Sequence, residues 1–462
     1  MKRRLFIKLA TGSAVLFTLK NKVKAFIRPI TSKLRANGLE ESTPLQLGSI
    51  QFSLDNNNGS LFIRWDEKNP IELPEWKRES ATNIKSNPVA YTLFGDTSGK
   101  IVKAKFSFVN NTEDRFFRIR AVYKDAPQKV ALSEYNSLGP PFGISQQNEL
   151  QTYKWQEIPD SLKTVNISQV CLLWQYAEDK FDPAIPLEWK DITCSSHKIF
   201  TVLNELSEFP WSDSKNNVTN PWVSVLELSC LWAKGTSTKH TAAELITKQI
   251  YSMGRNDNSF RPGRKIFKYK AGEDYLHLLT FDSEKIQAPY FNLTSFLSQL
   301  NNKSREEMGG ACESWAAIVV TFSNILRCGL RIKRFAAIEG GFTLNSSLLI
   351  GSDDNDWRSR DTQQTKESDF AYHVVAALPN DDSSKMLIYD ACLAVDEREN
   401  PSAPHTPVVP AGMIFGKPDE VKSYLYYLVD SEERDSRNFF VYEFNVYPGF
   451  IPIIRLKLED FT

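Results

Sequence analysis

The sequence predicts an α+β protein in which a β-rich half precedes a half that combines helices with strands. Residues 37–206 alternate short apolar runs with turn clusters and show no long helical periodicity, as is typical of antiparallel sheets. Beyond residue 216, two segments repeat apolar residues at helical spacing, and three short apolar segments follow. The 462 residues, 41% hydrophobic and 12% aromatic, suffice for two or three domains with sizeable cores.

The first 25 residues have the layout of an export signal. They hold seven Lys or Arg and no acidic residue, with an apolar run from Leu9 to Leu19 and then Val23-Lys24-Ala25 at cleavage-site spacing. The run is shorter than the roughly 20 residues that span a bilayer. Arg3-Arg4-Leu5-Phe6-Ile7-Lys8 resembles the twin-arginine (Tat) signal of bacteria, although Lys2 stands where Ser or Thr is usual.

We therefore expect residues 1–25 to be a signal peptide that engages the Tat export machinery and gives a periplasmic or secreted protein. A basic N-terminus folded into the protein and an uncleaved membrane tether are the alternatives.

Segment 37–206 is expected to form one or two β-sandwich modules. Two Ig-like sandwiches, divided near Asp125 to Leu138, are one such arrangement. The segment SIQFSLDNNNGSLFIRW consists of two alternating runs around an Asn-rich turn and predicts a hairpin. Later runs such as RFFRIRAVY and VCLLWQYAE predict further strands, with the tryptophans of this half in its core.

Charge and cysteine usage limit the function classes. Basic and acidic residues number 56 each, and without the first 25 residues 49 basic face 56 acidic residues, so nothing favours nucleic-acid binding. The six cysteines include no CxxC pair and no metal-site spacing, so we expect neither a metal ion nor another cofactor. We expect the cysteines to be buried free thiols, and Cys171 with Cys194, on neighbouring predicted strands, is the first pair to test for a disulfide.

Two helices are predicted in the second half. Thr241 caps the first, whose apolar residues recur at helical spacing as far as Gly254. The second opens at Cys312 and ends before Gly329. RIKRFAAIEGGF, FAYHVVAAL and KMLIYDACL predict three strands. The polar stretch from Leu344 to Asp369 is expected to cross the surface, and GSDDNDW within it to be a solvated loop rather than a calcium site.

Cys312 has the setting of a nucleophile. A helix N-terminus stabilises a thiolate through aligned dipoles and unpaired N–H groups, which can also hold an oxyanion. The small residues of GGAC would let a substrate backbone approach, although a core cysteine at a tight turn is the alternative. Such a nucleophile needs a histidine that exchanges its proton and an acceptor that orients the histidine. His373 lies inside FAYHVVAAL and Asp390 ends MLIYD, so a hairpin would place them side by side.

The three residues resemble a known family. They occur in the order and local settings of the transglutaminase-like domain, a branch of the papain-like cysteine enzymes. GGACESWA, ILRCGLRIKRFAAIEGGF, YHVVAAL, LIYDACL and AAELITKQIY carry the resemblance, which covers about Pro221 to Leu393. Val375 stands where many members have Trp, and Arg331 stands where they often have Pro.

The resemblance implies that residues 216–462 form a catalytic domain, in which a helix-borne Cys312 packs on an antiparallel sheet that carries His373 and Asp390. The cysteine would attack an amide or peptide bond of a protein or peptide substrate, and the histidine would protonate the leaving amine. A peptidase or amidase is expected. An amine-crosslinking transglutaminase and a non-catalytic binding protein on the same fold are the alternatives, and no feature of the sequence fixes an oligomeric state. A second oxyanion donor is expected from three candidates: Gln299, Asn301 and Asn302.

Overall fold

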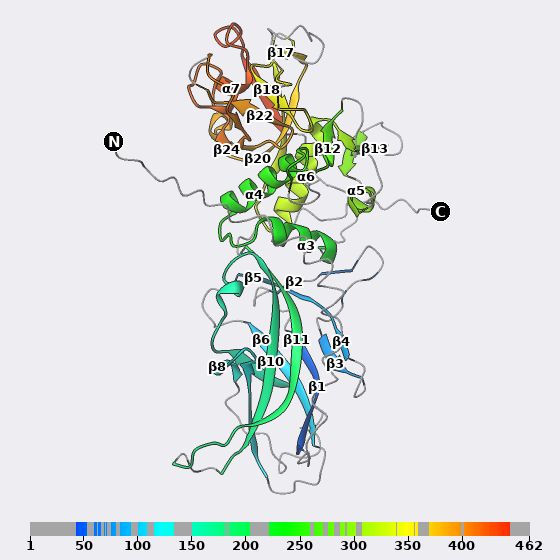
Figure 1. Cartoon of the computed structure of the whole chain (residues 1–462), viewed down its shortest axis with the longest axis vertical. Coiled ribbons are helices and arrows are strands. Elements are labelled where there is room, and N and C mark those ends of the chain that lie inside the picture. The colour runs from blue at the N-terminus through cyan, green and yellow to red at the C-terminus, as the bar shows by residue number, and fades with distance from the viewer. Residues whose placement is uncertain are drawn as a thin grey trace, which may run out of the picture.

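In the computed structural model strands dominate and helices are few, in agreement with the predicted α+β class. The structure describes residues 43–443 apart from 53–59, 62, 66–68, 70, 72–74, 80–83, 94–99, 109–114, 134–149, 181, 183, 204–220, 259–262, 271–275, 281–286, 292, 302–306, 339, 355, 359–368 and 399–401. The predicted signal peptide lies outside the described residues. Figure 1 shows an elongated molecule, with long curled strands at one end, helices in the middle and smaller sheets at the other end.

The strands between Leu45 and Val202 form one eleven-stranded sheet in the order β2-β5-β11-β10-β7-β8-β9-β6-β1-β3-β4. Neighbours are antiparallel except for the parallel pair β5 and β11. The strands are β1 (Leu45–Phe52), β2 (Ser60–Leu61), β3 (Glu75–Arg78), β4 (Ile84–Ser86), β5 (Val89–Thr92), β6 (Ile101–Phe108), β7 (Phe117–Tyr123), β8 (Ala126–Ser133), β9 (Gln151–Trp155), β10 (Asn166–Glu178) and β11 (Lys190–Val202).

This sheet curls around a core of its own. Buried side chains alternate with more exposed ones along much of β6, β7 and β10, as strands with one buried face require. Trp76, Trp155 and Trp174 lie in this core as predicted, whereas Trp65 is 47% exposed and Trp189 lies outside the core cluster. Tyr153 and Phe106 pack edge-on against Trp174, with ring centroids 5.2 and 5.6 Å away.

The strand pairing corrects one prediction. Residues 49–65 do not form a hairpin, because β1 pairs with β3 and β6 whereas β2 pairs with β5. Alternation identifies a strand but not its partner, and strands from later in the chain occupy both edges of β1. At Asp125, where the sequence allows a division into two modules, β7 and β8 form a hairpin within the one sheet.

All six cysteines are free, as expected, and the candidate disulfide between Cys171 and Cys194 does not form. Strands β10 and β11 are neighbours, but their register places Cys171 opposite Ser196 and Cys194 opposite Leu173. The Cys171 sulfur instead lies 3.5 Å from the Ser196 hydroxyl. The expectation of free thiols is therefore confirmed, although Cys194 is exposed and Cys171 is half-buried rather than buried.

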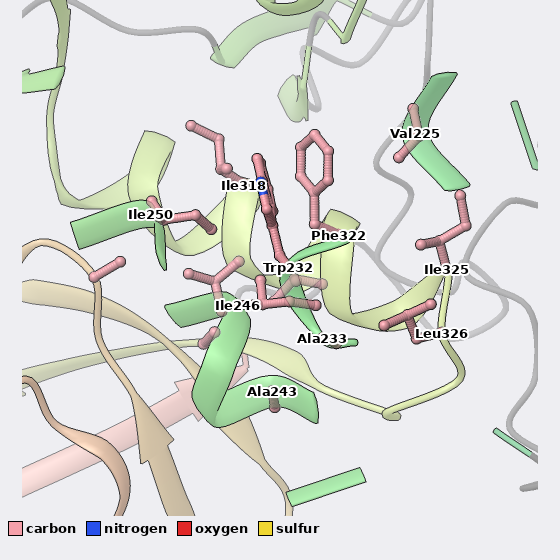
Figure 2. Packing of buried hydrophobic residues seen from close by; sticks show 14 of the residues in the cluster. Val225, Trp232, Ala233, Ala243, Ile246, Ile250, Ile318, Phe322, Ile325 and Leu326 are labelled. Atoms are coloured by element: carbon pink, nitrogen blue, oxygen red, sulfur yellow. The ribbon is translucent and has the colours of Figure 1, made fainter. Parts of the chain in front are cut away.

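Three helices pack against one another in the middle of the molecule (Figure 1). Figure 2 shows Trp232, Ile246 and Phe322, one from each helix, in the shared apolar cluster. The rings of Trp232 and Phe322 lie 4.8 Å apart. The described helices are α3 (Val223–Trp232), α4 (Lys239–Ser252), α5 (Leu293–Asn301), α6 (Cys312–Asn324) and α7 (Tyr424–Leu428).

Helix α4 begins earlier than predicted, because Thr238 rather than Thr241 caps it. The Thr238 side chain accepts a hydrogen bond from the Thr241 amide, which satisfies a free N–H of the first turn. Both threonines are acceptable caps by residue type, so the sequence pattern does not distinguish them. Helix α6 begins at Cys312 as predicted, and Gly329 follows its end with a φ of 74°.

The second half is built on a five-stranded antiparallel sheet in the order β24-β21-β20-β16-β25. Its strands are β16 (Arg331–Ala337), β20 (His373–Leu378), β21 (Leu387–Tyr389), β24 (Ala411–Ile414) and β25 (Phe439–Glu443). Smaller sheets join β12 (Phe267–Tyr269) to β15 (Met308–Gly310), β13 (Leu276–Thr280) to β14 (Gln287–Phe291), β17 (Phe342–Thr343) to β19 (Asp369–Phe370), and β18 (Ser347–Leu349) to β22 (Leu393–Asp396) and β23 (Pro407–Val408). Strand β18 is buried, so the predicted surface excursion includes core residues.

Strand β20 is buried on both faces, which explains its uninterrupted apolar run. Val374 and Ala376 join the cluster that includes α6, whereas Val375 and Ala377 join a second cluster with Phe335. The strand that carries His373 is thus held between two apolar layers.

The two halves share part of one core. Phe200 and Val202 at the end of β11 belong to the same cluster as Trp222 and the α3 side chains. Backbone hydrogen bonds also join the halves, such as that from the Val165 amide to the Thr236 carbonyl over 2.7 Å. The predicted boundary between residues 206 and 216 lies outside the described residues and stays a prediction. Within the described part of the chain, every helix is too short or too polar to cross a membrane.

Candidate active site

Cys312 is the first residue of α6 and is 5% exposed. A Cβ on Gly310 would lie 3.0 Å from Ser314 Cβ and 3.2 Å from the Trp315 ring. Trp315 Nε1 also donates a hydrogen bond to the Gly310 carbonyl over 2.9 Å. At Gly310, the small side chain therefore lets the first turn of α6 close against β15, a packing role that the sequence-based expectation of substrate approach did not include.

His373 and Asp390 form a buried pair, as the predicted hairpin requires. Strands β20 and β21 are antiparallel neighbours, and His373 Nε2 lies 2.9 Å from Asp390 Oδ2, with both side chains at most 2% exposed. Asp390 accepts two further hydrogen bonds, from the Tyr424 hydroxyl over 2.8 Å and from the Cys392 amide over 2.7 Å. These donors fix the carboxylate, which in turn fixes the plane of the imidazole.

The thiol of Cys312 is close to this pair without being hydrogen-bonded to it. Within the described residues, His373 Nδ1 is buried and has no hydrogen-bond partner. The thiol instead donates to Glu313 Oε2 over 3.3 Å. The backbone N–H of Val374, the residue after His373, donates to the sulfur. The resting structure therefore gathers the three predicted residues, but the Cys312 thiol donates its hydrogen bond to the Glu313 carboxylate and not to His373.

Burial raises the pKa of the Cys312 thiol well above its ordinary value, and the neighbouring Glu313 carboxylate raises it further. The Val374 amide acts in the opposite direction. Desolvation and an adjacent negative charge thus outweigh the helix N-terminus on which the sequence-based expectation of a thiolate depended. In this arrangement the resting thiol is protonated at neutral pH.

Glu313 is a site residue that the sequence analysis missed. Its second oxygen, Oε1, accepts a hydrogen bond from the Tyr372 hydroxyl over 2.5 Å. The guanidinium carbon of Arg334 lies 3.6 Å from the centre of the Tyr372 ring. Glu313 directly follows Cys312, and Tyr372 directly precedes His373. This adjacency was the only feature of the sequence that could have identified them. Tyr424 comes from α7 and had no signal near the motifs.

A cavity of about 930 Å³ lies beside the site. Tyr269 and Phe370 line it, and their rings stack with centroids 6.3 Å apart. Phe370 also packs against the imidazole of His373, with ring centroids 5.1 Å apart. The cavity thus ends at an aromatic wall that borders the buried pair.

One set of three residues in the described part could hold a metal ion: His373, Asp390 and Cys392, whose ligand atoms lie within 4.8 Å of one another. Imidazole, carboxylate and thiolate together are a donor set that suits zinc. Both Asp390 oxygens already accept hydrogen bonds here, and burial raises the pKa of the Cys392 thiol well above its ordinary value. The set is therefore engaged in the hydrogen-bond network of the candidate active site.

Other predicted residues lie elsewhere. Gln299 is half-buried on α5, whereas the side chains of Asn301 and Asn302 are outside the described residues, so the second oxyanion donor stays a prediction. The acidic loop is tied by ion pairs, including Lys265 with Asp353 over 2.7 Å. This agrees with a solvated loop.

Comparisons with known proteins do not assign this chain to a family. No protein-family model matches the chain, and no curated protein matches it. A crystal structure of red sea bream transglutaminase is similar to this chain with a TM-score of 0.30 and 12% identity, over 68% of this chain and 50% of that one. The chain thus spans about half the length of that transglutaminase, and the likeness is a weak one to its fold.

Proposed function

We propose that this protein is an exported, cysteine-dependent acyl-transfer enzyme that acts on amide or peptide bonds, as a peptidase or amidase with a transglutaminase-like domain. The observation that carries the proposal is the buried pair of His373 and Asp390, placed where the next residue's amide meets the Cys312 sulfur. An imidazole that is oriented through Nε2 and has a free Nδ1 can accept a proton from a nucleophile.

In this proposal the thiol proton passes to His373 Nδ1 and the sulfur attacks the carbonyl carbon of the substrate. The amide of Cys312 itself, in the first turn of α6, would donate to the resulting oxyanion. The C–N bond then breaks, the leaving amine takes the proton from the imidazole, and an acyl-thioester remains on Cys312. Water, deprotonated by the same imidazole, attacks the thioester and regenerates the thiol. Asp390 holds the imidazole throughout these steps.

The proposal is tested by the rate of iodoacetamide labelling at each cysteine across pH, read by peptide mass spectrometry, in the wild type and in His373→Ala. We expect Cys312 to label more readily than the buried Cys230 and Cys328 and to lose that reactivity in the variant. The buried thiols serve as internal references within each protein. A Cys312 that labels no faster than they do, or that ignores the loss of His373, would support a binding protein instead.

Acyl transfer itself is tested with p-nitrophenyl acetate as a generic acyl donor. Acetylation of Cys312 should release a burst of p-nitrophenol, and the acetyl group should then pass to water. Transfer to a labelled primary amine in preference to water would indicate the crosslinking alternative. No acetylation in a protein that labels with iodoacetamide would contradict acyl transfer.

A further inference from the structure

Within the described part of the chain, the negative charge of Glu313 beside the nucleophile has no cationic partner. Glu313 is half-buried, and its two oxygens accept hydrogen bonds from neutral donors, the Cys312 thiol and the Tyr372 hydroxyl. Among the described residues no Lys or Arg forms an ion pair with it. A partly buried carboxylate with only neutral donors is stabilised further when a positive charge pairs with it.

One described positive side chain contacts the phenol donor of Glu313 rather than its carboxylate. Arg334 lies over the face of the Tyr372 ring, at 3.6 Å, so it supports the phenol that donates to Glu313 rather than the carboxylate itself. In the neighbouring cavity, Lys265 is paired with Asp353. Among the described residues the charge of Glu313 thus has no cationic partner, which leaves the carboxylate able to bind a positively charged group of a substrate.

We propose that Glu313 is a specificity residue that binds a cationic group, an ammonium or guanidinium, carried by the acyl-donor substrate close to the attacked carbonyl. This inference rests on the proposed acyl-transfer function and names its substrate class. A cation at Glu313 forms a charge-assisted pair and competes with the thiol for Oε2. The thiol, having lost its acceptor, transfers its proton to His373 Nδ1, so a matching substrate releases the nucleophile that attacks it.

The same contact explains the resting state. With no substrate bound, the thiol proton stays on sulfur beside the carboxylate, which keeps Cys312 in its less reactive form. Burial of the thiol works in the same direction. Cys312 is thus expected to react more slowly with neutral or anionic reagents than with cationic ones.

The test uses three methanethiosulfonates of similar size: the 2-aminoethyl reagent, which is cationic, the neutral 2-hydroxyethyl reagent, and the anionic 2-sulfonatoethyl reagent. Each thiolate attacks the sulfenyl sulfur, forms a new S–S bond and releases methanesulfinate. The rate at Cys312 is measured by peptide mass spectrometry and divided by the rate at the exposed Cys194 of the same molecule. The ratio of cationic to anionic rates cancels the thiolate fraction of the free protein, so it reports attraction of the cation together with any deprotonation of Cys312 that the cation induces.

We expect the cationic reagent to be favoured over the anionic one at Cys312 by at least about tenfold relative to Cys194. Glu313→Gln should abolish the preference, whereas Glu244→Gln, on the exposed side of α4 where Glu244 pairs with Lys248, should keep it. Tyr372→Phe, which frees Oε1, should keep the preference while the position of the carboxylate relaxes.

A wild-type ratio equal to that of Cys194, a ratio unchanged in Glu313→Gln, or a Cys312 that none of the reagents reaches would each overturn the inference. These outcomes differ from a failure of acyl transfer, which appears as indifference of Cys312 labelling to His373→Ala. The preference for a cation can therefore fail while the proposed chemistry stands.

Discussion

Two strands of this protein each bury a histidine, one in each half, and the two side chains have different partners. His197 on β11 is 1% exposed and its Nε2 lies 2.8 Å from the Ser195 hydroxyl, which accepts from Trp174 Nε1. His373 on β20 is fully buried and faces a carboxylate at 2.9 Å. In the described residues both have a buried Nδ1 without a hydrogen-bond partner.

The two environments differ in whether they can stabilise a protonated imidazole. Burial lowers the pKa of His197 to about 3, because a hydroxyl and the ring of Phe52 do not compensate an imidazolium. Asp390 supplies a negative charge that can compensate one on His373. Burial alone therefore does not distinguish the two histidines, whereas the fixed carboxylate beside His373 does.

The largest effect is expected when that carboxylate loses its charge. Asp390→Asn keeps the size of the side chain, but it can no longer stabilise an imidazolium, so release of p-nitrophenol from p-nitrophenyl acetate should fall by about 100-fold or more. Ala is a poorer choice, since it would leave the Tyr424, His373 and Cys392 donors buried without an acceptor. An Asp390→Asn variant that folds and turns over at the wild-type rate would remove the distinction between the two histidines.

A smaller effect is expected from pH in the β-rich half. The folded-state pKa of His197, about 3, lies below the ordinary value of about 6.5, so the unfolded state binds the proton first as pH falls. The contribution of neutral His197 to the free energy of unfolding is fully present above pH 6.5 and is lost progressively towards pH 3. About 2 kcal/mol of it is lost by pH 5.

The pH dependence of the free energy of unfolding is measured by urea denaturation at pH 7 and pH 5, in the wild type and in His197→Gln. The glutamine stays neutral and can still form a hydrogen bond with Ser195. The variant should lose about 2 kcal/mol less than the wild type between the two pH values. Equal losses would mean that His197 accepts a proton in the folded state.

The smallest effect is expected at the edge of the active-site network. Tyr424→Phe removes one of the hydrogen bonds to Asp390 and leaves the His373 bond in place. The free energy of unfolding should fall by about 1–1.5 kcal/mol, with turnover reduced less than tenfold. Thermal or chemical denaturation together with the acetylation assay checks both numbers. A loss of activity as large as that of Asp390→Asn would make the hydroxyl, not the carboxylate alone, the feature that separates the two histidines.

The sequence was most informative where local pattern decides the structure. Helix α6 starts at Cys312 and β20 carries His373 because apolar spacing and glycine positions act within a few residues. It was least informative where distant segments meet. The partners of β1, the register of Cys171 and Cys194, and the arrival of Tyr424 at Asp390 depend on how the whole sheet assembles, which alternation does not encode.

The candidate site follows the same division. Three residues with recognisable chemistry could be named from spacing, and the structure gathers them. The state of the thiol could not be predicted, because it depends on a carboxylate one residue away and on the degree of burial, and neither has a pattern.

The apolar cluster common to both halves has a consequence for dissecting the molecule. Phe200 and Val202 of the long curled sheet and Trp222 beside α3 shield one another from water. A fragment that starts after residue 216 would present this apolar surface to solvent and lose the burial that helps to hold α3 on α6. The β-rich half therefore stabilises the half that carries Cys312. We expect the two halves to unfold as one cooperative unit rather than as independently folding domains.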